Sequence, residues 1–192
     1  MAIIGLRDLY YAVLDTDSNS EATYEEIKPI APAVEATITP ELAEAIFYAD
    51  DGPDEVITIF KEAIVGLQTK DIGLSTQAEL LGHKFQGSVL IKHANDEPPY
   101  VAIGFRSLKS DGSYRYVWLM KGKFAPYNEQ FKTKGEAIEF QTPTITGKFI
   151  GREHDDAWQA LIDSNDDKFA DNFEDDGDCT WFDKVYGATE EA

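Results

Sequence analysis

The sequence predicts a mainly β protein, a β-sandwich or small barrel with one flanking α-helix. Runs of β-branched and aromatic residues recur along the chain, bounded by Gly, Pro, Asn or Asp. Apolar residues at helical spacing are nearly absent. The 192 residues are the length of one domain, which can bury a core without cross-links. The single cysteine, Cys179, excludes an internal disulfide framework and a cysteine-rich zinc site.

These runs place the expected strands at residues 8–14, 33–39, 44–49, 56–70, 88–93, 99–109, 114–124, 136–150 and 156–162. One helix is expected from Ser75 to Gly82, because Ser75 suits an N-cap and Gly82 suits a helix stop. Asp111 and Gly112 suit a type I′ turn, so the strands on either side of them should form a hairpin.

The strand at 114–124 is apolar on both faces. One face would carry Tyr114, Tyr116, Trp118 and Met120, and the opposite face would carry Val117 and Leu119. A strand of this kind is covered on both sides. We therefore expect a sandwich core against one face and a helix or a neighbouring subunit against the other.

Polar residues alternate with apolar ones in other strands. This alternation predicts that one face of each such strand is exposed to solvent, and we call it the wet face. In strands 33–39 and 56–70 these polar residues are Glu35, Thr37, Thr39, Glu62 and Gln68. In the stretch 136–150, Glu139 belongs to a polar phase that changes at Pro143, where we expect a bulge because proline cannot donate to a ladder.

Acidic residues outnumber basic ones, 36 to 17, giving a net charge of −19. This charge argues against binding DNA through its phosphates. Residues 153–192 alone hold 14 acidic residues and two lysines. The same stretch holds six aromatic residues: Trp158, Phe169, Phe173, Trp181, Phe182 and Tyr186.

We interpret 1–162 as the β domain and 163–192 as an acidic arm. The aromatic residues of the arm would dock either on the chain's own core or on a neighbouring subunit. A further hypothesis is that the arm is mobile in the monomer and becomes ordered on assembly, through Trp181 and Phe182.

Motifs for catalysis or cofactor binding are absent from the sequence. There is no nucleophile elbow, phosphate-binding loop or His-Glu-x-x-His motif. The three histidines, His83, His93 and His154, lie far apart in the sequence, and the acidic residues around Cys179 make it a poor thiolate. We therefore expect no enzyme, no cofactor and no catalytic or metal site.

Two stretches imitate calcium-binding loops. The residues at the ligand positions are Asp15, Asp17, Asn19 and Glu26, and then Asp163, Asn165, Asp167 and Glu174. The turn-making glycine is replaced by Ser20 in the first stretch and by Lys168 in the second. An ordinary loop and an acidic arm are therefore favoured over calcium sites.

The N-terminus has no signal-peptide pattern, because Arg7 and Asp8 interrupt its apolar stretch, and no apolar run is long enough to span a bilayer. We therefore expect a soluble protein made in a cytoplasm and not exported by a cleaved signal.

Six sequence words resemble the major tail proteins, or tail tube proteins, of long, non-contractile-tailed phages (siphophages). They are AIIGLRDLYYA at 2–12, YADDGP at 48–53, LLGH at 80–83, PYVAIGF at 99–105, YRYVWL at 114–119 and EFQTPTITG at 139–147. They occur in order over about residues 1–162, and the acidic C-terminal stretch fits the family pattern least well. The resemblance implies a tail-tube-like β-sandwich with a flanking helix.

The same resemblance implies hexameric rings of this chain stacked into a tube, made in the bacterial host cytoplasm and located in the virion tail. DNA would pass through the lumen during genome ejection without specific binding. Further partners would be the tape measure protein and the neck and tail-tip proteins, and no membrane would be involved.

Two sets of assembly residues are expected within such a tube. The Gly-Pro turn beside three acidic residues, between apolar strands, predicts an inter-ring loop made of Ala49, Asp50, Asp51, Gly52, Pro53 and Asp54. The wet faces predict a negatively charged lumen wall made of Glu35, Thr37, Thr39, Glu62, Gln68 and Glu139. Two alternatives from other classes stay open: a soluble β-sandwich binding module, for instance for carbohydrate, and a calcium-assisted hydrolase.

Overall fold

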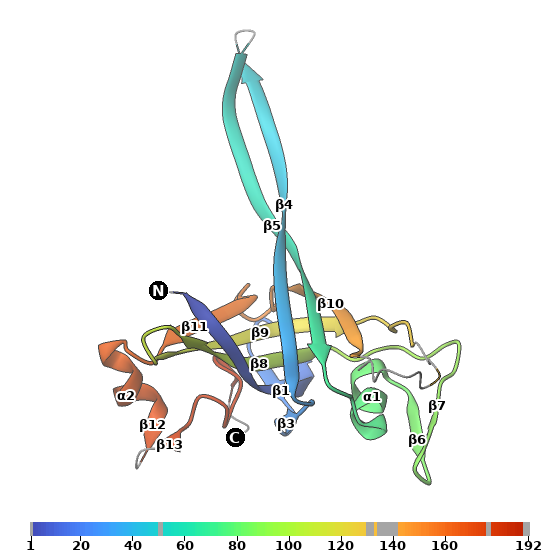
Figure 1. Ribbon diagram of the computed structural model, residues 1–192. Helices are drawn as coiled ribbons and strands as arrows, with labels where there is room; N and C mark the ends of the chain where they lie inside the picture. The colour runs from blue at the N-terminus through green and yellow to red at the C-terminus, as the bar shows by residue number, and fades with distance from the viewer. Residues whose placement is uncertain (1, 50–51, 130–132, 134–141, 176–177, 190–192) are drawn as a thin grey trace.

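The computed structural model describes residues 2–49, 52–129, 133, 142–175 and 178–189. Its main feature is an antiparallel sheet of nine strands (Figure 1). Seven strands follow the order β2-β1-β8-β9-β10-β5-β4, while β3 pairs with β1 and β11 pairs with β9. The predicted mainly β class is confirmed, and the described strands do not close into a barrel.

The strands of this sheet are β1 (Ile3–Asp17), β2 (Ala22–Tyr24), β3 (Lys28–Pro29), β4 (Ala33–Ala49), β5 (Gly52–Thr69), β8 (Val101–Lys109), β9 (Tyr114–Phe124), β10 (Thr144–Ile150) and β11 (Gln159–Asp163). Two separate ribbons pair β6 (Lys84–Gln86) with β7 (Val89–Ile91), and β12 (Glu174–Asp175) with β13 (Asp178–Cys179). The helices are α1 (Leu74–Leu81) and α2 (Asp167–Phe173).

Element positions agree with the sequence best where the local signals are strongest. Strand β9 has the predicted bounds, and α1 lies within one residue of its predicted span, ending at Gly82 in the left-handed conformation. The expected strands 33–39 and 44–49 are one continuous strand, β4. Helix α2 and the short strands β2 and β3 were not predicted.

The stretch predicted as a strand at 136–150 is described only in part. Strand β10 begins at Thr144, directly after Pro143. Residues 134–141, which include Glu139, lie outside the described residues, so the bulge expected at Pro143 stays a prediction.

The predicted hairpin between β8 and β9 is present, but its turn is of a different type. A type I′ turn needs a positive φ at both central residues, whereas only Gly112 has one here, at 84°. The Gly112 N–H donates to the Lys109 carbonyl at 3.0 Å, and the Lys109 N–H donates to the Ser113 carbonyl at 2.9 Å. This pattern is a tight turn followed by a glycine bulge, which the Asp111 carboxylate stabilises by accepting from the Ser113 N–H and hydroxyl.

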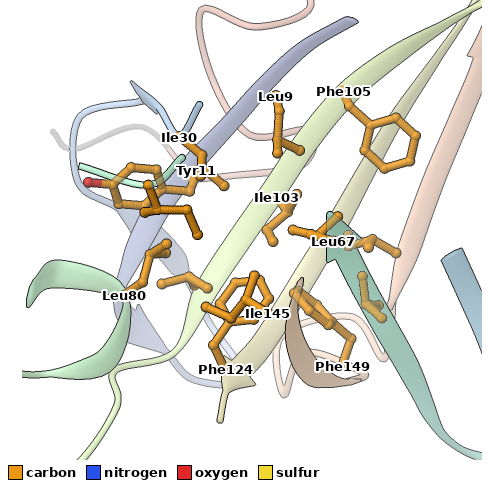
Figure 2. Close-up of a cluster of buried hydrophobic side chains, with 14 of the residues drawn as sticks. Leu9, Tyr11, Ile30, Leu67, Leu80, Ile103, Phe105, Phe124, Ile145 and Phe149 are labelled. Atoms are coloured by element: carbon orange, nitrogen blue, oxygen red, sulfur yellow. The ribbon is translucent and has the colours of Figure 1, made fainter. Parts of the chain in front are cut away.

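The sheet encloses a first hydrophobic cluster on one face, shown in Figure 2. Leu67 of β5, Leu9 of β1 and Ile103 of β8 meet in this cluster, so the β5 end of the sheet packs against its β1 and β8 region. Leu80 and Leu81 of α1 add to the same cluster, which places the helix against the core. The arrangement is sandwich-like.

A second cluster lies on the other face of β9. Tyr116, Trp118 and Met120 belong to it, whereas Val117 and Leu119 belong to the first cluster. The predicted division of β9 into two apolar faces is thus confirmed. Trp118 also explains Gly104 on the adjacent β8, because a Cβ there would lie 2.8 Å from the indole ring.

The cover of the second cluster comes from the C-terminal segment 164–189. Phe169 of α2 and Trp181 are buried against the cluster, and the Trp118 indole N–H donates to the Trp181 carbonyl at 3.0 Å. At its far end, Thr189 exchanges two hydrogen bonds with Ala22 of β2: the Thr189 N–H donates to the Ala22 carbonyl, and the Ala22 N–H donates to the Thr189 hydroxyl. The segment therefore packs on its own chain.

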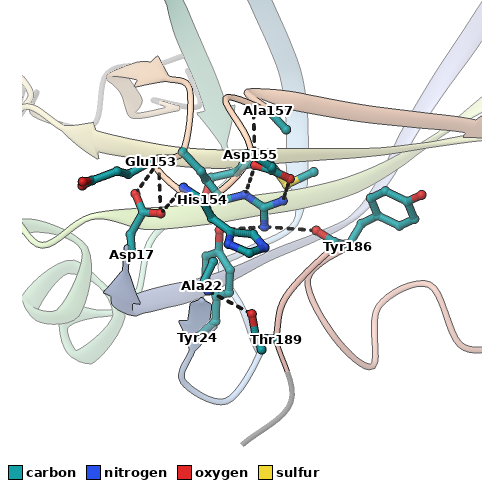
Figure 3. A network of polar contacts seen from close by, with 11 residues as sticks. Asp17, Ala22, Tyr24, Glu153, His154, Asp155, Ala157, Tyr186 and Thr189 are labelled. Atoms are coloured by element: carbon teal, nitrogen blue, oxygen red, sulfur yellow. Dashed lines mark hydrogen bonds and ion pairs between the residues drawn. The ribbon is translucent and has the colours of Figure 1, made fainter. Parts of the chain in front are cut away.

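Arg152 holds this segment by hydrogen bonds within a polar network that includes Tyr24, Asp155 and Tyr186 (Figure 3). Its side chain is 1% exposed, and its guanidinium donates to both carboxylate oxygens of Asp155, at 3.1 and 2.6 Å. It also donates to the Tyr186 carbonyl at 3.2 Å and to the Tyr24 hydroxyl at 3.4 Å. One buried cation thus joins the loop after β10, strand β2 and the C-terminal segment.

Candidate assembly surfaces

The β4–β5 hairpin extends well beyond the body of the molecule (Figure 1). Near its base, β5 residues from Ala63 to Gln68 pair with β10 on one side and with β4 on the other. From Leu42 to Phe60, the described pairing is only between β4 and β5. Phe60 stacks on Trp158 with ring centroids 4.6 Å apart, which anchors the base. We call residues 42–60 the projecting hairpin.

Apolar side chains are exposed on both faces of the projecting hairpin. Leu42, Val56, Ile57 and Ile59 are between 47% and 62% exposed. The register pairs Ala43 with Ile59 and Ala45 with Ile57, which places these four on one face and Leu42 and Val56 on the other. A two-stranded ribbon is marginally stable alone, and contiguous exposed apolar surface marks interaction sites. The projecting hairpin therefore has the properties of an interface element.

The predicted inter-ring loop falls at the end of this hairpin. Ala49 pairs with Gly52 and closes the β4–β5 ladder. Asp50 and Asp51 lie outside the described residues, and Pro53 and Asp54 belong to β5. The sequence placed the interface in the turn, but the exposed apolar side chains lie along the strands behind it.

The predicted wet face is real for every predicted residue that the structure describes. The register pairs Glu35 with Gln68, Thr39 with Ile64, and Glu41 with Glu62, so these residues share one face of β4 and β5. Glu35, Thr37 and Thr39 are exposed, whereas Glu62 and Gln68 are half-buried. The opposite face carries Ala36, Ile38, Val65 and Leu67, which pack in the first cluster. The sequence period thus identified the correct faces.

This face carries lysine side chains beside the predicted acidic ones. Lys148 of β10 lies on the same face, and its ammonium donates to the Glu62 carboxylate at 2.7 Å. This hydrogen bond lowers the pKa of Glu62. Lys123 of β9 pairs with Lys148 in the register, so the face carries both signs of charge.

The two proposed arm anchors, Trp181 and Phe182, contact their own chain. Trp181 is 3% exposed and stacks on Tyr186, with ring centroids 5.5 Å apart. Phe182 packs against Tyr10, Tyr116 and Trp118. Of the two targets that the sequence left open, the structure shows the chain's own core. The single chain buries Trp181 and partly covers Phe182. Whether the arm becomes ordered only on assembly stays a prediction.

The acidic residues of the calcium-like stretches serve other contacts. Asp17 accepts from the Lys121 ammonium at 2.5 Å and from the backbone N–H groups of Glu153 and His154. Asp163 accepts from Arg115 and from Lys109. Within the described part of the chain, no group of three or more His, Cys, Asp or Glu residues could hold a metal ion.

Shared contacts of His83 and His93 with Asp96 were missed from the sequence, where the three histidines lie far apart. His83 Nδ1 lies 2.7 Å from an Asp96 carboxylate oxygen, and His93 Nδ1 lies 3.7 Å from the other oxygen. The Asp96 carboxylate also accepts from the His93 N–H. These bonds fold the loop between β7 and β8 back onto the end of α1.

Comparison with known proteins adds no assignment: no family model matches the chain, and no curated protein matches it. Among the residues that are described, no helix is long and apolar enough to cross a membrane.

Proposed function

We propose that the chain is the structural subunit of a phage tail tube, and that it assembles as hexameric rings stacked into a tube. The observation that carries the proposal is the projecting hairpin, whose apolar side chains find no cover within one copy. A subunit of a stacked assembly needs a surface of this kind. The six sequence words that resemble tail tube proteins support the same function independently.

Ring closure is supported by the edge of the sheet. Strand β4 is the last strand in the order, so its outer backbone N–H and C=O groups have no ladder partner among the described strands. Exposed strand edges invite pairing with another chain. A ring in which several copies close one continuous sheet would satisfy these groups.

The wet face of β4, β5 and β10 is proposed as the lumen wall. Its threonines and paired charges, such as Glu62 with Lys148, offer DNA phosphates little net attraction. DNA would thus pass during genome ejection without specific binding, in an assembly located in the virion tail. The tape measure protein and the neck and tail-tip proteins are proposed as the remaining partners, and no catalytic step is proposed.

The direct test is assembly of the purified protein. Sedimentation velocity and negative-stain electron microscopy over a concentration series are expected to show rings and tubes. Deleting residues 50–54 should leave a folded protein, checked by circular dichroism, that does not stack. A monomer at all concentrations would contradict the proposal and favour a soluble binding module, which sugar-array binding would then identify.

The lumen assignment has its own test. Glu35→Lys combined with Glu62→Lys should slow DNA passage in phage particles, because new phosphate contacts would form. The matched control is Glu21→Lys combined with Glu153→Lys, which makes the same charge change at exposed positions away from this face. Normal ejection by the first variant, or outward-pointing Glu35 and Glu62 in an assembled tube, would contradict the assignment.

A further inference from the structure

We propose that the projecting hairpin of one copy seats against the β6–β7 hairpin of a second copy, in a head-to-tail contact. The inference deepens the proposed function, on which it rests, by naming the surface that receives the hairpin. Three independent features of the chain carry it: exposed apolar residues, opposite placement and complementary charge.

The β6–β7 hairpin is the second exposed apolar ribbon of the molecule. It forms a sheet of its own, separate from the nine-stranded sheet, and packs beside α1. Phe85, Val89 and Ile91 are between 39% and 56% exposed, and nearby Leu74 at the start of α1 is exposed too. Like the projecting hairpin, this ribbon has apolar side chains that its own copy does not cover.

The two hairpins project from opposite ends of the molecule (Figure 1). They cannot meet within one copy. The β6–β7 ribbon also lies to one side of the projecting hairpin (Figure 1). The two therefore meet between copies in successive layers that are displaced along the direction of the projecting hairpin and also shifted sideways. A contact between two different patches of the same chain repeats without limit, which is the geometry of a stack.

The charges of the two hairpins are complementary. Residues 41–60 hold six acidic residues and no lysine or arginine. Residues 84–93 hold Lys84, Lys92 and His93 and no acidic residue, although the whole chain carries a net charge of −19. Lys92 pairs with Glu129 at 2.5 Å, whereas Lys84 forms no ion pair with any residue that the structure describes.

Complementary charge fixes which surfaces meet. Two projecting hairpins repel each other, while a projecting hairpin and a β6–β7 ribbon attract. A head-to-tail contact is thus favoured over a symmetric contact between two projecting hairpins.

Engineered cysteines test the contact directly. In a Cys179→Ser background, one preparation carries Ile57→Cys and the other carries Val89→Cys. Mixed under mild oxidation, they should form a covalent heterodimer at least tenfold faster than Ile57→Cys alone forms a homodimer. The matched control replaces Val89→Cys with Leu161→Cys on β11, which is similarly exposed. Equal rates for Val89→Cys and Leu161→Cys, or faster homodimer formation, would overturn the inference.

Complementation provides a second measurement. Ile57→Asp with Ile59→Asp removes the projecting surface, and Val89→Asp with Ile91→Asp removes the receiving surface. Each variant alone should fail to stack, whereas a mixture should form stacks of two layers, since one intact pair of surfaces remains. Normal tubes from the Val89 and Ile91 variant would overturn the inference.

The experiments distinguish failure of the tail tube proposal from failure of the head-to-tail contact. Tubes without the Ile57–Val89 cross-link would leave the tail tube proposal standing and overturn the receiving surface. A cross-link without rings or tubes would support the head-to-tail contact and contradict the tail tube.

Discussion

The C-terminal segment 164–189 and the projecting hairpin 42–60 are both acidic segments with apolar side chains, yet they end in opposite environments. The C-terminal segment buries Phe169, Trp181 and Val185 on the sheet of its own chain. The projecting hairpin leaves Ile57 and Ile59 in solvent. The comparison teaches that the apolar content of a segment alone does not identify an interface. A segment buries its apolar side chains on its own chain only where that chain offers an uncovered apolar face close to the segment.

The reach of each segment has a structural cause. Strand β9 is apolar on both faces, so one face stays uncovered once the first cluster has formed. The C-terminal segment returns along that open face and is held there by Arg152. The projecting hairpin instead runs past the last residues that pair with β10, where its own copy offers no surface.

Removing an aromatic side chain from the C-terminal segment should have the largest effect on the free energy of unfolding. Trp181→Ala leaves a cavity among Tyr116, Phe173 and Tyr186, so we expect a loss of about 3–5 kcal/mol in the free energy of unfolding. Urea denaturation measures it. The control, Leu161→Ala at an exposed site, should cost under about 0.5 kcal/mol. Equal effects would mean that the segment does not pack on the core in solution.

A pH titration sharpens the comparison at the point where the C-terminal segment begins. Arg115 donates two hydrogen bonds to the Asp163 carboxylate and Lys109 donates a third, and these bonds lower the pKa of Asp163 to about 2. Because the pKa is lower in the folded state, Asp163 stabilises the fold above about pH 4, and this contribution disappears as the pH falls to about 2.

Asp163→Asn removes that contribution. Wild type should exceed the variant by about 1–2 kcal/mol in the free energy of unfolding near neutral pH, and the difference should shrink below about pH 4. Urea denaturation at several pH values measures it. The matched control is Asp183→Asn, outside this ion-pair cluster. A difference that stays constant down to pH 2 would contradict the ion pairing.

Substitution in the projecting hairpin should have the smallest effect on folding. Ile57→Asp exchanges one exposed side chain for another, so the free energy of unfolding should change by less than about 0.5 kcal/mol. Self-association, measured by sedimentation velocity, should nevertheless be lost, whereas Leu161→Asp should leave it intact. A large loss of folding stability would show that Ile57 is buried within one copy.

The sequence predicted those parts of the molecule that depend on local pattern. The period of two divided β9 into its two apolar faces and separated Glu35 and Thr37 from Ala36 and Ile38. Gly82 and Gly112 marked the end of α1 and the turn after β8, because a positive φ suits glycine. Of the candidate assembly residues, the described members of the wet face lie on one face as predicted, while the inter-ring role of the turn at 49–54 stays a prediction.

Tertiary structure alone decided how far each strand extends and what covers it. The alternation of polar and apolar residues within 33–39 and 44–49 would be the same in two short strands as in the long β4. No local signal therefore showed that the hairpin extends beyond the core. The aromatic residues of the C-terminal segment could have served a partner or their own chain equally well. Long-range contacts settled it, above all those of the buried Arg152 with Tyr24 and Tyr186. These contacts join residues 128 and 34 positions apart and leave no mark in local composition.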